Sequence, residues 1–424
     1  MEGLILFGVF LLLVFLNVNI AVSLAVSSIL TLMYMGERMT MVASSVYTSI
    51  GKYALLAIPF FILAGVIMEK AGISKRLIRF ARVMVGHRKS GMIAVTVIVC
   101  CFFAAISGSG PATVAALGAI LIPAMSTSGY NKGVSSALLA SSGAIGIIIP
   151  PSIAYVVYAS ITGTSVAKLF MGGWLPGILL GISYVIAARW SSRHNKNIVH
   201  DVKHSPKERW AAFKEAVWGL LMPVIILGGI YGGVFTPTEA AGVAVIYGLV
   251  IGVFVYREIK LRDLGKLFLD AAVSSATVMF IVACAGLFTY SLSISGAAAA
   301  MSNAILSVSS NKLVLMLIIN VIFLIAGCFV DANSAFFILM PIVTPIAVLL
   351  KLDMVHLGVF LTVNLAIGQI TPPVGVNLYA AAAVGNISAG EIIRKITPFI
   401  ICGIAALLII TYVPQLTLLL VNLL

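Results

Sequence analysis

Apolar residues fill long stretches of this chain, and short polar segments separate them. The run Leu4–Tyr34 near the start and the run Ile396–Leu424 at the end each exceed the length of about 20 residues that a helix needs to cross a membrane. Because lipid offers no hydrogen-bond partners, a spanning segment has to satisfy its backbone groups internally. The pattern predicts an all-α polytopic membrane protein that resides in the lipid bilayer.

The composition supports this prediction. Of the 424 residues, 61% are hydrophobic and 9% are charged, whereas soluble domains are about half apolar and about one quarter charged. These values exclude a cytosolic enzyme, a secreted disulfide scaffold, a disordered chain and a free nucleic-acid binder. No HExxH, GxSxG, GxxxxGK[ST] or GxGxxG motif occurs, so we expect no enzymatic activity. The cysteines lie in apolar runs without CxxC spacing and are expected to serve packing.

An internal repeat organises the chain. The string AIGIIIPP at 144–151 has a partner, AIGQITPP at 366–373, 222 residues later. The same offset pairs Pro123 with Pro345 and Pro176 with Pro398 without a gap. We therefore expect two homologous halves, 1–214 and 234–424, joined by a span at 215–233. In each half we expect a helical hairpin and a broken helix: 92–126 and 134–162, then 313–350 and 356–385.

The charges indicate how the two halves are oriented. The net charge is +13, and seven basic residues gather in the segment 69–90, whereas its counterpart 292–311 has none. Cytoplasmic loops are enriched in Lys and Arg, so 69–90 and the basic loop 189–214 are predicted to be cytoplasmic and 292–311 periplasmic. The prediction is an inverted-topology repeat, which is typical of secondary transporters.

Each expected broken helix contains a Pro–Pro pair. A proline has no N–H, so Pro150 and Pro151 remove the helical partners of the carbonyl groups of Gly146 and Ile147; Pro372 and Pro373 do the same to Gly368 and Gln369. Unpaired carbonyl groups in lipid have to line a cavity or contact a ligand, and a small monovalent cation is such a ligand. The alternative is a proline kink satisfied by neighbouring Ser residues or water.

Small polar residues mark the two expected hairpin tips, SGSGPAT (107–113) and VDANSAF (330–336). Helices starting at Pro111 and Ser334 would direct positive dipole ends at the tips, which suits an anion. Asp331 is a rare carboxylate in apolar sequence; it is either functional or the N-cap of the following helix.

Other polar residues have simpler expected roles. Glu239, in TPTEAAG (236–242), is expected to cap a helix from its first turn. Lys52 is expected to extend its head group toward the membrane surface. His194, His200 and His204 share the basic loop and are expected to be solvated.

Five ordered motifs resemble those of one transporter family, the large membrane subunit of tripartite ATP-independent periplasmic (TRAP) transporters. They are IPFFILAG (58–65), the SGSGPAT tip, GIIIPPS (146–152), TPTEAAG and GQITPPV (368–374), and the resemblance covers essentially the whole chain in order. One departure is Asn17-Val18-Asn19, where the family usually carries a Gly-x-Pro turn.

The resemblance implies an elevator-type sodium symporter in a bacterial inner membrane. It also implies a separate small membrane subunit, and a periplasmic substrate-binding protein that delivers an organic acid. In this family the acid is a C4-dicarboxylate, a 2-keto acid, a sugar acid or sialic acid.

The resemblance also implies particular site residues. Two sodium (Na+) sites would be formed by Ser107, Ser109, Gly146, Ile149 and Pro151, and by Gly327, Asp331, Gly368 and Thr371. The substrate would lie between the tips, near Gly110, Pro111, Asn333, Ser334 and Asn377.

Two other classes of transport protein compete with this interpretation. A stand-alone sodium–carboxylate symporter would share the inverted repeat but need no binding protein, and only the motif match argues against it. A channel would need a continuous pore, which paired inverted hairpins disfavour.

Overall fold

The computed structural model describes residues 1–88, 90–195, 197–199 and 201–423. Throughout these ranges the regular secondary structure is helical, as the apolar pattern predicts. Nine of the described helices are long and apolar enough to cross a membrane. Lys89 and His200, which figured in the charge and histidine predictions, lie outside the described residues.

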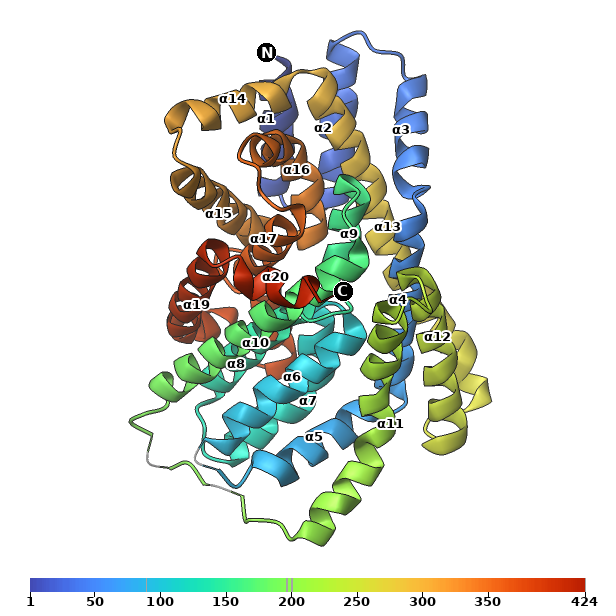
Figure 1. Cartoon of the computed structure of the whole chain (residues 1–424), viewed down its shortest axis with the longest axis vertical. Coiled ribbons are helices and arrows are strands. Elements are labelled where there is room, and N and C mark those ends of the chain that lie inside the picture. Colours follow the sequence, from blue (N-terminus) through green and yellow to red (C-terminus); the bar gives the residue numbers. More distant parts are fainter. Residues whose placement is uncertain (89, 196, 200, 424) are drawn as a thin grey trace.

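The described residues up to Tyr231 form eleven α-helices, in the order drawn from blue to green in Figure 1. They are α1 (Glu2–Phe15), α2 (Ile20–Tyr34), α3 (Thr40–Ile50), α4 (Ala57–Lys70), α5 (Ile73–Val85), α6 (Gly91–Ser107), α7 (Gly110–Thr127), α8 (Lys132–Ala144), α9 (Ile153–Thr162), α10 (Val166–Ser191) and α11 (Pro206–Tyr231).

Nine further α-helices follow in the described remainder of the chain, and α14 to α19 match α5 to α10 in order and approximately in length. They are α12 (Pro237–Val250, continued by a π-helical turn to Val255), α13 (Leu264–Ile294), α14 (Ala297–Val308), α15 (Lys312–Phe329), α16 (Ala332–Leu349), α17 (Met354–Gly368), α18 (Val376–Gly385), α19 (Ala389–Tyr412) and α20 (Gln415–Val421).

The two expected hairpins and the two expected broken helices are present. Helices α6 and α7 form the first hairpin, and α15 and α16 form the second. The first lies in the lower half of Figure 1 and the second in the upper half. Each is followed by a helix pair interrupted at a Pro–Pro sequence, α8 with α9 and α17 with α18.

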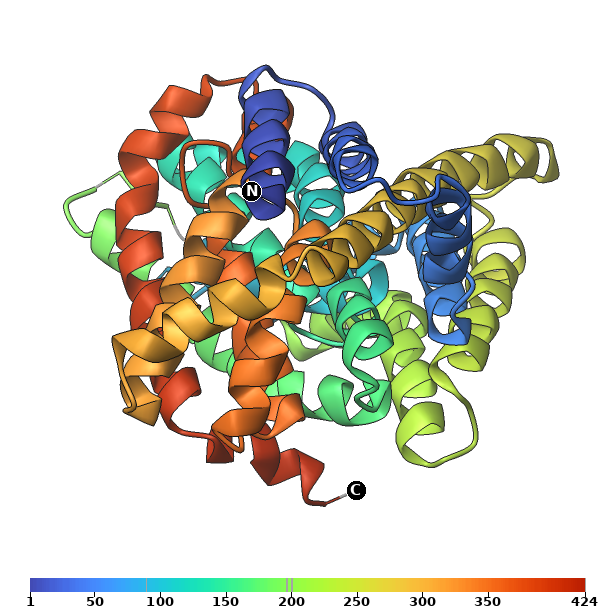
Figure 2. The same ribbon diagram turned by 90° about the horizontal axis from the view of Figure 1, so that it is seen from above.

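The centre of the molecule is formed by α8 and α17. Every residue of Gly133–Ala144 and of Val355–Gly368 is buried. The halves interlock around them, because α9 packs on α16 through the Tyr158 and Phe336 rings, whose centroids are 5.4 Å apart. Helix α18 in turn packs on α7 and α8. In Figure 2 the long helix α13 extends away from this centre beside α3.

The first apolar run is two helices rather than one. Asn17 has φ 62°, and the side chain of Asn19 accepts a hydrogen bond from the N–H of Ala21 to cap α2. Asparagine tolerates the left-handed region and caps helices well. The Asn17-Val18-Asn19 sequence therefore forms the turn in this chain without glycine or proline.

The basic segment 69–90 is not a loop, as the charge argument treated it. It contains α5, in which Arg76, Arg79 and Arg82 recur every third residue on one side while Leu77 and Ile78 are buried on another. The arginines pair with Glu258 (3.2 Å), Glu215 (2.5 Å) and Asp201 (2.7 Å), respectively. Counting the charges alone did not reveal this amphipathic helix.

The counterpart segment 292–311 is also helical over most of its length, as α14, and carries no charged residue. The loop 189–214 is shorter than expected, because α10 extends to Ser191 and a Ser205–Glu208 capping box starts α11 at Pro206.

Three smaller predictions have clear outcomes. Thr236 and Glu239 form a capping box at the start of α12, which confirms the capping role of Glu239. The Lys52 Nζ donates to the carbonyl of Ser160 at 2.7 Å, so its head group is held at the end of α9. The hairpin helices start slightly before Pro111 and Ser334, at Gly110 and Ala332.

Candidate functional site

The tip of the first hairpin, residues 107–110 between α6 and α7, is a cluster of oxygen atoms. The Ser107 and Thr113 hydroxyl groups lie 2.8 Å apart, and Thr113 also donates to the carbonyl of Ser109 at 2.8 Å. Gly108 at the turn has φ 59°, and a Cβ there would lie 3.0 Å from the carbonyl oxygen of Pro151. The turn therefore needs glycine, because both its backbone angle and its close approach to the first Pro–Pro pair exclude a side chain.

The first broken helix lies directly against this oxygen cluster. A Cβ on Gly146 would be 3.0 Å from the Ser109 oxygen and 3.1 Å from Thr113 Oγ1. Ser107, Ser109, Gly146 and the Pro151 carbonyl are thus brought together as the sequence predicts. Ile149 differs, because its side chain packs on Gly177 of α10.

The tip of the second hairpin, between α15 and α16, carries a carboxylate instead. Asp331 is the N-cap of α16 and accepts from the N–H groups of Asn333 (3.0 Å) and Ser334 (3.4 Å) and from the Ser334 hydroxyl. The capping role considered for Asp331 is therefore present. It does not exclude a ligand role, because a carboxylate has about four acceptor positions.

The second broken helix contacts its own hairpin through glycine. A Cβ on Gly368 would be 2.5 Å from the Cα of Gly327, so the two backbones touch where α17 ends. The N–H of Gly375 donates to the carbonyl of Cys328 at 3.2 Å. Thr371, in the same break, donates its hydroxyl to the carbonyl of Ile367 at 2.7 Å.

The expectation that the carbonyl groups before both Pro–Pro pairs lack partners is wrong for three of the four. The chain turns back at each pair, so donors from later residues reach these carbonyl oxygens. A carbonyl oxygen accepts two hydrogen bonds, so each keeps an acceptor position. The pairs are Ile147 with Ser152 Oγ (2.5 Å), Gly368 with the Thr371 N–H (2.9 Å) and Gln369 with the Asn377 N–H (3.0 Å).

The two halves meet at Gly110, the first residue of α7. A Cβ there would collide with Gln369 Oε1 and lie 3.0 Å from Asn377 Nδ2. Asn377 is fully buried and donates to the carbonyl of Ala140 at 3.1 Å. The side-chain oxygens of Gln369 and Asn377 are buried without a hydrogen-bond partner in the described part of the chain. An unsatisfied buried polar group costs about 1–3 kcal/mol, so this position suits a ligand.

Two of the residues at this junction were missed by sequence reasoning. Gln369 was considered only for its backbone carbonyl, although its side chain faces Gly110. Thr113 was seen only as the end of the SGSGPAT string; its position four residues after Ser109 is the signal that places its hydroxyl over the tip. Of the remaining expected substrate residues, Pro111 follows Gly110 in α7, while Asn333 and Ser334 lie at the second tip and donate to Asp331.

A cavity of about 260 Å³ reaches the first tip from the side of α4 and α13. Ser107, Ser109 and Ile153 line its inner end, and Glu69 and Ser274 line the part formed by α4 and α13. Among the described residues no cluster of three His, Cys, Asp or Glu side chains occurs. The candidate ligands are therefore hydroxyl, carbonyl and amide oxygens with one carboxylate, a set that suits a hard monovalent cation.

Paired hairpins facing paired broken helices define a polytopic membrane transporter, and the comparisons identify its family. The family described as "Tripartite ATP-independent periplasmic transporter, DctM component" matches residues 7–416. The chain belongs to this family, a family of permeases rather than enzymes, and the resemblance of its motifs is confirmed.

Relatives agree with this assignment, and a solved structure shares the fold. The chain is 44% identical over 413 residues to the isethionate TRAP transporter permease protein DctMQ of Oleidesulfovibrio alaskensis, covering 97% of this chain but 65% of that protein. It is 37% identical over 440 residues to the C4-dicarboxylate TRAP transporter large permease protein DctM of Rhodobacter capsulatus, covering 100% of both. The YdaH transporter of Alcanivorax borkumensis shares the fold, with a TM-score of 0.62, 16% identity, and coverage of 90% of this chain and 88% of that chain.

Proposed function

We propose that this chain is the large membrane subunit of a transporter that takes up a small organic acid together with sodium ions. The observation that carries the proposal is the first tip, where the uncapped start of α7 at Gly110 lies beside the break at Gly146. The relatives are named for isethionate and C4-dicarboxylates, so the substrate class is a small organic anion bearing carboxylate or sulfonate groups.

Sodium coupling is supported by the oxygens at both tips. At the first site the candidate ligands are Ser107, Ser109 and Thr113 beside the break at Gly146 and Pro151, with Ile149 able to offer only its carbonyl. At the second site they are the Asp331 carboxylate, the carbonyl groups near Gly327 and Gly368, and the Thr371 hydroxyl. At most one carboxylate per site favours a weakly bound monovalent ion over calcium, which normally recruits several.

The anion is proposed to lie at the start of α7. This helix has no side-chain cap, and Thr113 is the first of its N–H groups to find a backbone acceptor, at Ser109. Free N–H groups at a helix N-terminus attract anions. The side-chain oxygens of Gln369 and Asn377 would accept hydrogen bonds from a substrate that carries a hydroxyl group, as isethionate does, and would discriminate between acids with and without one. Sodium binding orders the tips, so sodium and substrate should each raise the affinity for the other.

The transport step is proposed to be an elevator movement. The hairpins and broken helices interlock as one body, whereas α3, α4, α12 and the first part of α13 form the side that extends away from it. A small membrane subunit would stabilise that side in the bacterial inner membrane. A periplasmic binding protein would deliver the anion, since basic side chains are scarce at both tips.

The test is uptake of a radiolabelled C4-dicarboxylate, and of isethionate in parallel, into proteoliposomes containing this chain with its small subunit and loaded binding protein. We expect saturable uptake that requires an inward sodium gradient and is negligible without the binding protein. Robust uptake by this chain alone would favour the stand-alone symporter. Equal uptake without sodium would reject the coupling ion.

The proposed orientation has its own test. Cysteines introduced at Ser191, at the end of α10, and at Asn303, on the exposed side of α14, should react with an impermeant thiol reagent from opposite sides of the membrane. Asn303 is the better probe than its neighbour Ser302, which is buried and donates to Ile342. Labelling of both positions from one side would contradict the inverted repeat.

A further inference from the structure

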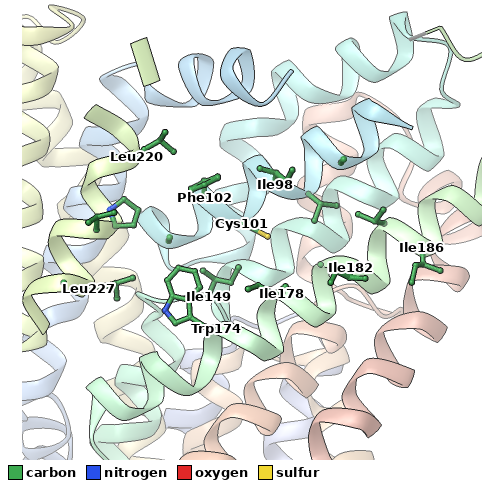
Figure 3. Close-up of a pocket in the computed structure, with 18 of the residues that line it drawn as sticks. Ile98, Cys101, Phe102, Ile149, Trp174, Ile178, Ile182, Ile186, Leu220 and Leu227 are labelled. Atoms are coloured by element: carbon green, nitrogen blue, oxygen red, sulfur yellow. The ribbon is translucent and has the colours of Figure 1, made fainter. Parts of the chain in front are cut away.

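An apolar cavity of about 660 Å³ lies between the first hairpin and the connecting helix, and Ile149 of the first break is one of its lining residues. Figure 3 shows side chains of three helices turned toward one another: Ile98, Cys101 and Phe102 of α6, Ile178 and Ile182 of α10, and Leu220 and Leu227 of α11. Such a volume is typical of a site for a small or chain-like ligand. Its lining is almost entirely hydrocarbon, so an organic anion would not enter it.

The cavity is open along its outer side. Ile178, Ile182 and Ile186 form a stripe on α10 and are about half-exposed, and Val224 on α11 is 63% exposed. In a bilayer these side chains face the acyl chains of the surrounding lipids. A void of this size lined by apolar groups stays dry, so hydrocarbon is the material available to fill it.

One end of the stripe is charged. Arg189, in the last turn of α10, is the one charged residue among those that line the cavity. Next to it Trp190 is 48% exposed, and Trp210 is exposed near the start of α11, whereas Trp218 is exposed near the middle of that helix. Tryptophan and arginine gather at the level of lipid head groups, so this end lies at the membrane surface.

The length of the stripe matches one leaflet. From Arg189 to Ile178 the α10 axis rises about 16 Å at about 1.5 Å per residue. Half of the hydrocarbon core is about 15 Å thick. At the inner end Trp174 closes the cavity by donating its indole N–H to the Tyr231 hydroxyl on α11 at 3.3 Å.

We infer that the cavity binds one acyl chain of an anionic phospholipid of the leaflet on the Arg189 side, with the phosphate contacting Arg189. The inference does not depend on sodium coupling or on the identity of the transported acid. A lipid held here separates α11 from α6, which ends at the first hairpin tip, and from α10, which packs on the neighbouring break at Ile149. It therefore sets how closely the connecting span packs against the part of the molecule that binds the substrate.

The test uses Trp174 as a reporter in the full chain reconstituted in nanodiscs. Trp190, Trp210 and Trp218 are replaced by Phe, and lipids with brominated acyl chains quench the remaining fluorescence on contact. Brominated phosphatidylglycerol should quench Trp174 at a several-fold lower mole fraction than brominated phosphatidylcholine. Arg189→Gln should remove that difference while leaving the quenching at full bromination unchanged.

Two glycine-to-leucine variants, one inside the cavity and one outside it as the matched control, test whether the cavity is the binding site. A Cβ on Gly228, which lines the cavity, and a Cβ on Gly242, in α12 outside it, both meet no atom within 4 Å. Gly228→Leu should reduce the quenching of Trp174 at least twofold, and Gly242→Leu should leave it unchanged. The inference would be overturned if the two lipids quenched equally well or if Gly228→Leu had no effect. It would also be overturned if adding the small membrane subunit abolished the quenching, which would mean that a helix of that subunit covers the cavity.

Discussion

The two hairpin tips occupy equivalent places in the repeat but differ in chemistry. The first tip has two hydroxyl groups and a carbonyl, and the helix after it starts without a side-chain cap. The second has a carboxylate that caps its own helix by accepting from two N–H groups. A capped helix start repels an anion, and an uncapped start attracts one. We therefore expect the second tip to bind only the cation, and the first tip to attract the anion beside its own cation site.

Helices α5 and α14, which precede the two hairpins, differ as well. Helix α5 carries three arginines in ion pairs with the segments around α11 and α12, whereas α14 carries no charge. The positive-inside rule explains the asymmetry if α5 is cytoplasmic. The same architecture is thus used twice with side chains suited to two sides of a membrane.

The largest expected effect is at the uncapped tip. In Gly110→Ala the new Cβ would collide with Gln369 Oε1 and press on Asn377. Overpacking costs about 1–3 kcal/mol, so we expect uptake to fall at least about tenfold in reconstituted vesicles. Gly390→Ala, in a helix position with open space, is the control and should retain uptake. Normal uptake by Gly110→Ala would show that the first tip does not contact the substrate.

A smaller effect is expected at the second break. Thr371→Val removes a hydroxyl with little change of shape, and we expect the sodium concentration for half-maximal uptake to rise several-fold at unchanged expression. Thr362→Val is the matched control, because its hydroxyl, like that of Thr371, donates to the carbonyl four residues earlier. If both variants raised the required sodium concentration equally, the cause would be the loss of a hydroxyl-to-carbonyl hydrogen bond rather than the loss of a sodium ligand. Lithium or a proton gradient should substitute poorly.

The smallest effect concerns the charged helix α5. The hydrogen bond from Arg82 lowers the pKa of Asp201 below its usual value. A carboxyl whose pKa is lowered on folding stabilises the protein above its unfolded pKa of about 4, and this contribution is lost as the pH falls through the lowered value. Asp201→Asn should cost at most about 1 kcal/mol at pH 7, measured by thermal unfolding in detergent. The difference from wild type should shrink below about pH 4. A difference that is the same at pH 7 and pH 3, or one shared by Asp263→Asn, would contradict the ion-pair explanation.

Much of the architecture could be predicted from the sequence because prolines and charges leave strong local signals. The Pro–Pro pairs marked both broken helices, and the motif order identified the family. The helix α5 was missed because its arginines dominated the interpretation of residues 69–90. Gln369 and Thr113 were missed because their roles come from the approach of distant segments. For the same reason the partners of the Ile147, Gly368 and Gln369 carbonyl groups could not be read from local spacing.

The central claim, that the carboxylate of the second tip binds sodium while the first tip also attracts the anion, is tested most directly by Asp331→Asn. Asparagine caps helices about as well as aspartate, so the charge is removed while α16 is retained. A contact to a charged group is worth about 1.5–3 kcal/mol, so the sodium concentration for half-maximal uptake should rise at least about tenfold. At saturating sodium the substrate concentration for half-maximal uptake should stay within about twofold of wild type. The sodium sites are then full, so a weaker sodium affinity no longer lowers the affinity for the substrate. An unchanged sodium dependence, or an equal shift in both concentrations, would contradict the account.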